Sequence, residues 1–126
     1  MAGERVLVVE DNDKNMKLFR DVLQASGYST FEATTGEQAV ELALVHEPAL
    51  VLMDFQLPGM NGIDALKVLR EDASTERIPV IAVTASVMQQ DRNLITEAGF
   101  DGYIGKPINL KEFIDTVRAM LEGKPT

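Results

Sequence analysis

Short apolar runs alternate along the chain with longer stretches in which apolar residues recur every three or four positions. The short runs predict buried strands, and the longer stretches predict amphipathic helices. This alternation favours an α/β fold in which parallel strands are joined by helical crossovers. The strands are expected at Arg5–Val9, Tyr28–Ala33, Leu50–Met53, Pro79–Val83 and Tyr103–Gly105.

The helical stretches carry boundary signals and apolar stripes of unequal strength. Thr35 and Asn109 are suited to N-caps, Gly27 and Gly99 to helix stops, and Pro48 prevents continuation of the second helix. The apolar positions expected to face the core are Met16, Phe19 and Leu23 in the first helix, Ala39, Val40, Ala43 and Leu44 in the second, Ile63, Leu66 and Leu69 in the third, Met88, Ile95 and Ala98 in the fourth, and Leu110, Phe113, Ile114, Val117, Met120 and Leu121 in the fifth. The fourth helix has the thinnest stripe, so we expect it to dock most weakly.

The composition fits one globular domain spanning residues 1–126, with 45% hydrophobic and 25% charged residues. No apolar run approaches the roughly 20 residues that span a bilayer, so membrane insertion is not expected. The lack of cysteine excludes disulfides, thiol catalysis and cysteine-bound zinc, and with no signal peptide we expect a cytoplasmic protein. A net charge of −8 opposes binding to nucleic acid.

Polar residues stand at the ends of four predicted strands. Glu10 and Asp11 follow the first, Asp54 the third, Thr84 the fourth and Lys106 the fifth. In a doubly wound parallel sheet these ends border the crevice where ligands bind. Two carboxylates ~4 Å apart repel by about 4 kcal/mol at an effective dielectric of about 20, so a cation must offset them. Lys106 supplies one positive charge, and an all-oxygen set of ligands suits Mg²⁺ better than zinc.

Asp54 is the candidate nucleophile of this crevice. With Mg²⁺ and Lys106 lowering the negative potential, its carboxylate could attack phosphorus and form an aspartyl phosphate. The three phosphoryl oxygens would be bound by Mg²⁺, by Lys106, and by the Thr84 hydroxyl with the backbone N–H of Ala85. Movement of Thr84 towards the phosphoryl group would leave room for Tyr103 to turn inward, and the fourth helix could follow.

Five segments, in this order and spacing, resemble the signature of response-regulator receiver domains. They are Val9–Asn12, Leu52–Asp54, Pro58–Gly59 with Gly62, Val83–Ala85 and Tyr103–Pro107. The resemblance covers nearly the whole chain. The stretches Glu10–Phe19 and Met53–Pro58 are similar in particular to the DivK-type single-domain regulators of bacterial cell division.

The resemblance implies a flavodoxin-like, doubly wound, five-stranded parallel sheet of order 2-1-3-4-5 with five helices. It implies that Asp54 takes a phosphoryl group from a phosphohistidine on a histidine kinase or histidine phosphotransfer protein, in a two-component or phosphorelay pathway. The first helix would meet this donor. The surface of the fourth helix, fifth strand and fifth helix would bind downstream regulatory proteins, with the chain a monomer or weak dimer. Such a regulator catalyses only its own phosphorylation and dephosphorylation.

The resemblance also assigns roles around the metal. Asp11 and Asp54 match direct Mg²⁺ ligands, Gln56 would add its backbone carbonyl, and Glu10 would act through water. Gln56 and Ser86 match positions that tune the lifetime of the phosphate. Many family members have two aspartates where this chain has Glu10 and Asp11, a departure that bears on how water is held around the metal.

The phosphate-binding and switch residues are implied in the same way. Thr84 matches the switch hydroxyl, Tyr103 the switch aromatic and Lys106 the phosphate-binding lysine. The Lys106–Pro107 bond is expected to be cis, as is usual in the family.

Each of these residues has an ordinary alternative when taken singly. Residues 10–13 could form a helix N-cap cluster, Asp54 a loop acid, Thr84 a strand threonine, Lys106 a strand-end lysine and Tyr103 a partly exposed packing residue. Their joint position at four strand ends favours one shared site. The single histidine, His46, is expected at a helix end near backbone carbonyls.

Three alternatives to the signalling switch make different demands on the sequence. A phosphatase with an aspartyl-phosphate intermediate needs a general acid where this chain has Gln56, which cannot serve as one. An electron carrier on the same topology needs a phosphate loop, and the acidic residues 10–13 would repel a cofactor phosphate. A receiver excised from a hybrid histidine kinase stays open, although Met1 and the short polar end, Gly123–Thr126, favour a free-standing protein.

Overall fold

Five parallel strands form one sheet in the part of the chain that the computed structural model describes, residues 3–55, 57, 60–85 and 89–122. Their order is β2-β1-β3-β4-β5, as predicted. The strands are β1 (Arg5–Val9), β2 (Ser29–Ala33), β3 (Leu50–Asp54), β4 (Val80–Thr84) and β5 (Gly102–Gly105). The winding direction changes between β1 and β3, so the ligand-binding crevice is expected at their carboxyl ends.

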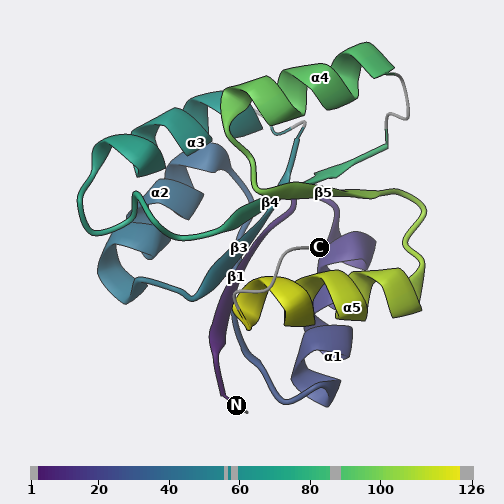
Figure 1. Cartoon of the computed structure of the whole chain (residues 1–126). Coiled ribbons are helices and arrows are strands. Elements are labelled where there is room, and N and C mark those ends of the chain that lie inside the picture. The colour runs from purple at the N-terminus through teal and green to yellow at the C-terminus, as the bar shows by residue number, and fades with distance from the viewer. Residues whose placement is uncertain (1–2, 56, 58–59, 86–88, 123–126) are drawn as a thin grey trace.

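Helices cover both faces of the sheet (Figure 1). They are α1 (Asp13–Ala25), α2 (Gly36–His46), α3 (Gly62–Glu71), α4 (Gln89–Ala98) and α5 (Leu110–Leu121). The first and last helices lie on one face, and α2, α3 and α4 lie on the other. Among the described residues, none of the helices has the length and apolar character of a membrane span.

Short polar side chains begin four of these helices. Each accepts a hydrogen bond from the backbone N–H three residues further on, a capping bond that stabilises a helix by about 1 kcal/mol. The four caps are Asn12, Thr35, Asn61 and Asn109, of which Thr35 and Asn109 were predicted. After α1 the chain turns at Gly27 with φ of 95°, as its predicted stop role requires.

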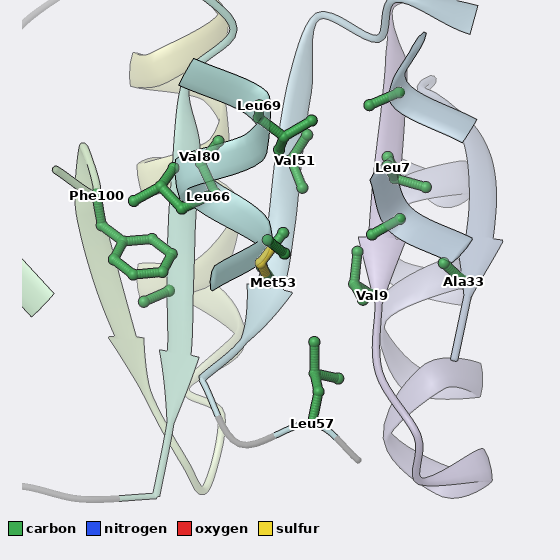
Figure 2. Close-up of a cluster of buried hydrophobic side chains, with 14 of the residues drawn as sticks. Leu7, Val9, Ala33, Val51, Met53, Leu57, Leu66, Leu69, Val80 and Phe100 are labelled. Atoms are coloured by element: carbon green, nitrogen blue, oxygen red, sulfur yellow. The ribbon is translucent and has the colours of Figure 1, made fainter. Parts of the chain in front are cut away.

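The sheet separates two hydrophobic clusters. Figure 2 shows the cluster under α2, α3 and α4, where Leu7, Met53, Leu66 and Leu69 gather around the sheet. On the other face the rings of Phe19 from α1 and Phe113 from α5 stack with centroids 5.4 Å apart. Residues of β1 and β3 alternate between the two clusters, as strands buried on both faces must.

Two predicted core positions are wrong. Leu44 is 40% exposed and Leu110 is 49% exposed. The buried face of α2 is formed by the small residues Ala39 and Ala43, and Leu44 lies about 100° further round the helix, towards solvent. Leu110 is the first residue of α5, and the buried stripe begins one turn later, at Phe113. The partly buried members of the predicted stripes are Val40, Ile63, Ala98, Ile114, Met120 and Leu121.

The docking of α4 is thin, in agreement with the apolar pattern. Ile95 is the one buried residue in the described part of this helix, and Ala98 is partly buried. Met88, the third predicted contact, lies outside the described residues.

Arg70 joins the end of α3 to the far edge of the sheet. Its guanidinium donates to the carbonyl oxygens of Glu76 and Ile78 at 3.0 and 2.7 Å, and to the Asp101 carboxylate at 2.8 Å. The same Asp101 oxygen accepts from the backbone N–H of Val80, the first residue of β4, at 2.8 Å. Arg70 therefore fixes both the entry to β4 and the turn between α4 and β5.

Arg70→Ala is expected to lower the free energy of unfolding by about 1.5 kcal/mol, because backbone carbonyls and a carboxylate lose a charged donor together. Urea unfolding would measure the loss. Arg77→Ala, which removes an exposed arginine nearby, is the matched control and should change stability by less than about 0.5 kcal/mol. Equal effects for the two variants would contradict the role given to Arg70.

Candidate functional site

The strand register brings the polar strand ends together. Val9 pairs with Met53, Asp54 with Val83, and Thr84 with Gly105. The residues that end these strands or follow them therefore meet at one edge of the sheet, and the predicted cluster is present.

Lys106 lies between two buried carboxylates. Its Nζ is 3.1 Å from Oε1 of Glu10 and 3.2 Å from Oδ2 of Asp54. Glu10 is only 1% exposed and Asp54 6%. Because buried charges are costly without a partner, the lysine is the group that allows both acids to lie inside the protein.

Burial and proximity perturb the titration of this cluster. Burial raises the pKa of Glu10 above its ordinary value, and the neighbouring Asp54 carboxyl group adds to the rise. Burial alone would lower the pKa of Lys106, but its contacts with Glu10 and Asp54 outweigh burial and raise it. The lysine therefore stays charged throughout the physiological range.

One oxygen of Glu10 keeps an unfilled acceptor position. Oε2 accepts from the backbone N–H of Asn12 at 3.1 Å. Lys106 forms an ion pair with Oε1, and Oε1 accepts no hydrogen bond from the described residues. A buried carboxylate oxygen in this condition is suited to a cation or a metal-bound water.

Glu10, Asp11 and Asp54 each offer a carboxylate oxygen, and these oxygens all lie within 4.8 Å of one another. Two of the acids are buried and Asp11 is exposed at the rim. Such a set of hard oxygen ligands, with room for water, fits Mg²⁺ and does not fit zinc. Gln56, expected to add its backbone carbonyl, lies outside the described residues.

An open cavity of ≈ 390 Å³ lies over this cluster. Its walls are formed by Glu10, Asp11, Asn12, Asn15, Asp54, Ala85 and Lys106. Ala85 is thus at the site, as predicted, whereas Ser86 lies outside the described residues. Asn12 and Asn15 were not predicted as site residues, although Asn12 caps α1 and Asn15 lies on its first turn, so both are beside the acids.

The two residues predicted to act in the switch, Thr84 and Tyr103, differ in burial. Thr84 is buried, and its backbone carbonyl accepts from the N–H of Lys106 at 2.8 Å, which ties the end of β4 to the lysine. Tyr103 is 41% exposed and faces outward from β5. The Lys106–Pro107 bond is cis, as expected.

His46 is not part of the carboxylate cluster in the described residues. It ends α2, and its ring stacks on Phe31 with centroids 4.2 Å apart. The position at a helix end was predicted; the aromatic partner was not.

The sequence of the chain matches a known family over most of its length. Residues 6–118 match the family model of the response regulator receiver domain. The polar-differentiation response regulator DivK of Brucella ovis is 47% identical over 116 residues, which cover 92% of this chain and 94% of the relative. DivK of Brucella anthropi shows the same identity and coverage.

Solved structures agree with the fold. The receiver domain of the sensor histidine kinase PA1611 from Pseudomonas aeruginosa superposes with a TM-score of 0.89 at 32% identity, covering 96% of this chain and 99% of that one. That structure contains a magnesium ion coordinated in its active site cleft. A putative response regulator from Chloroflexus aurantiacus gives a TM-score of 0.91 at 28% identity, with coverage of 95% and 98%.

The chain belongs to the response regulator receiver domain family. It is a phosphoacceptor switch of two-component signalling and not a conventional enzyme, so the phosphatase and electron-carrier alternatives are set aside. Among its curated relatives are the polar-differentiation regulators named DivK.

Proposed function

We propose that Asp54 accepts a phosphoryl group from a phosphohistidine on a histidine kinase or histidine phosphotransfer protein. A carboxylate oxygen of Asp54 would attack phosphorus while the phosphorus–nitrogen bond breaks, and the imidazole would leave with the bonding electron pair. The observation that carries the proposal is the position of Asp54, with its carboxylate against Lys106 at the floor of the acidic cavity.

The metal ligands in this proposal are Asp11, Asp54 and the backbone carbonyl of Gln56. Glu10 would act through a metal-bound water, which is supported by the unfilled acceptor position on its buried Oε1. Mg²⁺ bound by these groups would supply positive charge next to the phosphoryl oxygens. Gln56 and Ser86 are proposed to set the lifetime of the phosphate.

Lys106 has two roles in this proposal, one before and one after phosphoryl transfer. Without phosphate it balances the charges of Glu10 and Asp54. After transfer its ammonium would bind one phosphoryl oxygen, and the Thr84 hydroxyl and the Ala85 N–H would bind another. Drawing Thr84 towards the phosphoryl group would let Tyr103 turn inward.

The surface of α4, β5 and α5 is proposed to report this change to downstream regulatory proteins, and α1 to meet the phosphodonor. Similarity to the DivK proteins supports a role in polar differentiation or cell-division control. We also propose that residues 1–126 act as one receiver domain, monomeric or weakly dimeric. A cytoplasmic location stays a prediction, and a hybrid kinase is the alternative setting, since the PA1611 receiver belongs to a sensor kinase.

Intact-mass measurement after incubation with acetyl phosphate and Mg²⁺ tests the proposal. Wild type should gain one phosphoryl group, whereas Asp54→Ala and wild type in excess EDTA should gain none. If folded wild type gains no phosphoryl group, or Asp54→Ala gains it equally, the role given to Asp54 is wrong.

A further inference from the structure

Arg92 on α4 lies over the exposed ring of Tyr103 on β5. The guanidinium carbon is 5.3 Å from the ring centroid, which is within the range of a cation–π contact. Tyr103 is the aromatic residue that the proposed function expects to turn inward. The contact therefore joins the switch residue to the helix beside it.

The position of Arg92 does not depend on an acid of α5. Arg92 and Glu112 line the same cavity of ≈ 320 Å³, between α4, β5 and α5. Arg92 and Glu112 are both described residues, and they form no ion pair with each other, although both line this cavity. In addition, the Nε–H of Arg92 is buried without a hydrogen-bond acceptor in the described part of the chain. The tyrosine ring is thus the partner that the structure gives to this charge.

The contact matters because the described part of α4 buries few apolar side chains against the sheet. Ile95 is its one buried residue in the described part of the helix. Arg70 fixes the turn after the helix through the Gly99 carbonyl and Asp101. Arg92, one turn before Ile95, adds a contact between the opposite half of α4 and β5.

We propose that Arg92 is a latch that holds Tyr103 at the surface while Asp54 carries no phosphate. The inference rests on the proposed function, because it concerns a contact that opposes the inward turn of Tyr103 in the same switch. An inward turn of Tyr103 must break the cation–π contact, so the contact stabilises only the outward arrangement. A phosphoryl group that favours the inward arrangement must break this contact, so removal of Arg92 should strengthen phosphoryl binding by up to the factor that the contact contributes.

The experiment measures the affinity for beryllofluoride, a phosphoryl mimic, in the presence of Mg²⁺. The bound fraction is quantified by fluorine NMR. Arg92→Ala is expected to lower the apparent Kd by about two- to fivefold, the range that an exposed cation–π contact produces. Arg92→Lys keeps a cation and should stay nearer to wild type. Arg118→Ala removes an exposed arginine from α5 and controls for net charge, with no change expected.

A double-mutant cycle separates a latch from a general structural effect. Arg92→Ala should tighten beryllofluoride binding in a Tyr103→Phe background, which keeps the ring, but not in a Tyr103→Ala background, which removes it. Thermal unfolding checks that all variants are folded. If Arg92→Ala binds no more tightly than Arg118→Ala, or the effect survives loss of the ring, the latch is refuted while the proposed function stands. If wild type binds no beryllofluoride and gains no phosphoryl group, the proposed function fails and the latch with it.

Discussion

Lys106→Met is expected to lower the free energy of unfolding of the metal-free chain by about 3 kcal/mol at neutral pH. Lys106 is the cation that contacts both Glu10 and Asp54, and removing one partner of a buried ion pair leaves uncompensated charge inside the protein. The same substitution should reduce phosphorylation by acetyl phosphate at least about tenfold, because a phosphoryl oxygen loses its charged donor.

The loss of stability should depend on pH in a defined direction. The pKa of Glu10 in the folded wild type is already raised above its ordinary value of 4.5, chiefly by burial. Without Lys106 it rises further, so the folded state binds a proton that the unfolded state has released. Stability is then retained below the unfolded pKa and is lost as pH rises through the folded pKa. The variant should therefore approach wild-type stability near pH 4.5 and fall below it towards pH 8.

Urea unfolding in EDTA at several pH values would measure this, with Lys111→Met, an exposed lysine at the start of α5, as the control. Addition of Mg²⁺ should restore part of the stability, since the metal supplies charge to the same carboxylates. A variant equally unstable at pH 4.5 and pH 8 would show that Lys106 matters through packing and not through charge.

Gly36→Ala is expected to destabilise the chain by about 2 kcal/mol, although alanine is the better helix former. A Cβ at Gly36, the first residue of α2, would overlap the carbonyl oxygen of Met60 and lie 3.0 Å from its Cβ. Backbone cannot yield as a flexible side chain can, so the segment between β3 and α3 must shift. That segment follows directly on the strand that carries Asp54.

Denaturant unfolding would compare this variant with Gly105→Ala, where an added Cβ meets nothing within 4 Å. The control should lie within about 0.5 kcal/mol of wild type. If Gly36→Ala is as stable as the control, the close approach of α2 to Met60 is not a constraint on the fold.

The order of the helices and strands could be predicted because several kinds of sequence signal agreed with one another. Apolar runs, caps such as Thr35 and Asn109, and the stop at Gly27 all indicated the same boundaries. The errors at Leu44 and Leu110 have different causes: Leu110 is the first residue of α5, one turn before its buried stripe begins, whereas Leu44 lies outside a narrow buried face of α2. A periodic pattern identifies an apolar side of a helix, but the width of the buried stripe depends on how closely the helix approaches the sheet.

The cluster of acids and lysine could also be predicted, since parallel strands bring their carboxyl ends together. The direct contact between Lys106 and Glu10 could not, because sequence gives no side-chain distances. The same holds for Arg70 and Arg92. Their partners lie on elements whose spatial neighbourhood depends on the complete fold, and arginines on polar helix faces give no local signal that separates them from solvated ones.

The two hydrophobic clusters have a consequence for cooperativity. Ile95 of α4 belongs to one cluster and Phe113 of α5 to the other, and the strand between these helices, β5, is at the edge of the sheet. In the free chain the two layers are connected chiefly through the strands, so each layer can open without the other. A protein bound across α4 and α5 would join the layers from outside. Local opening on one side of the sheet would then require opening on both, and amides in α1 and α2, which that protein does not touch, would exchange with solvent more slowly.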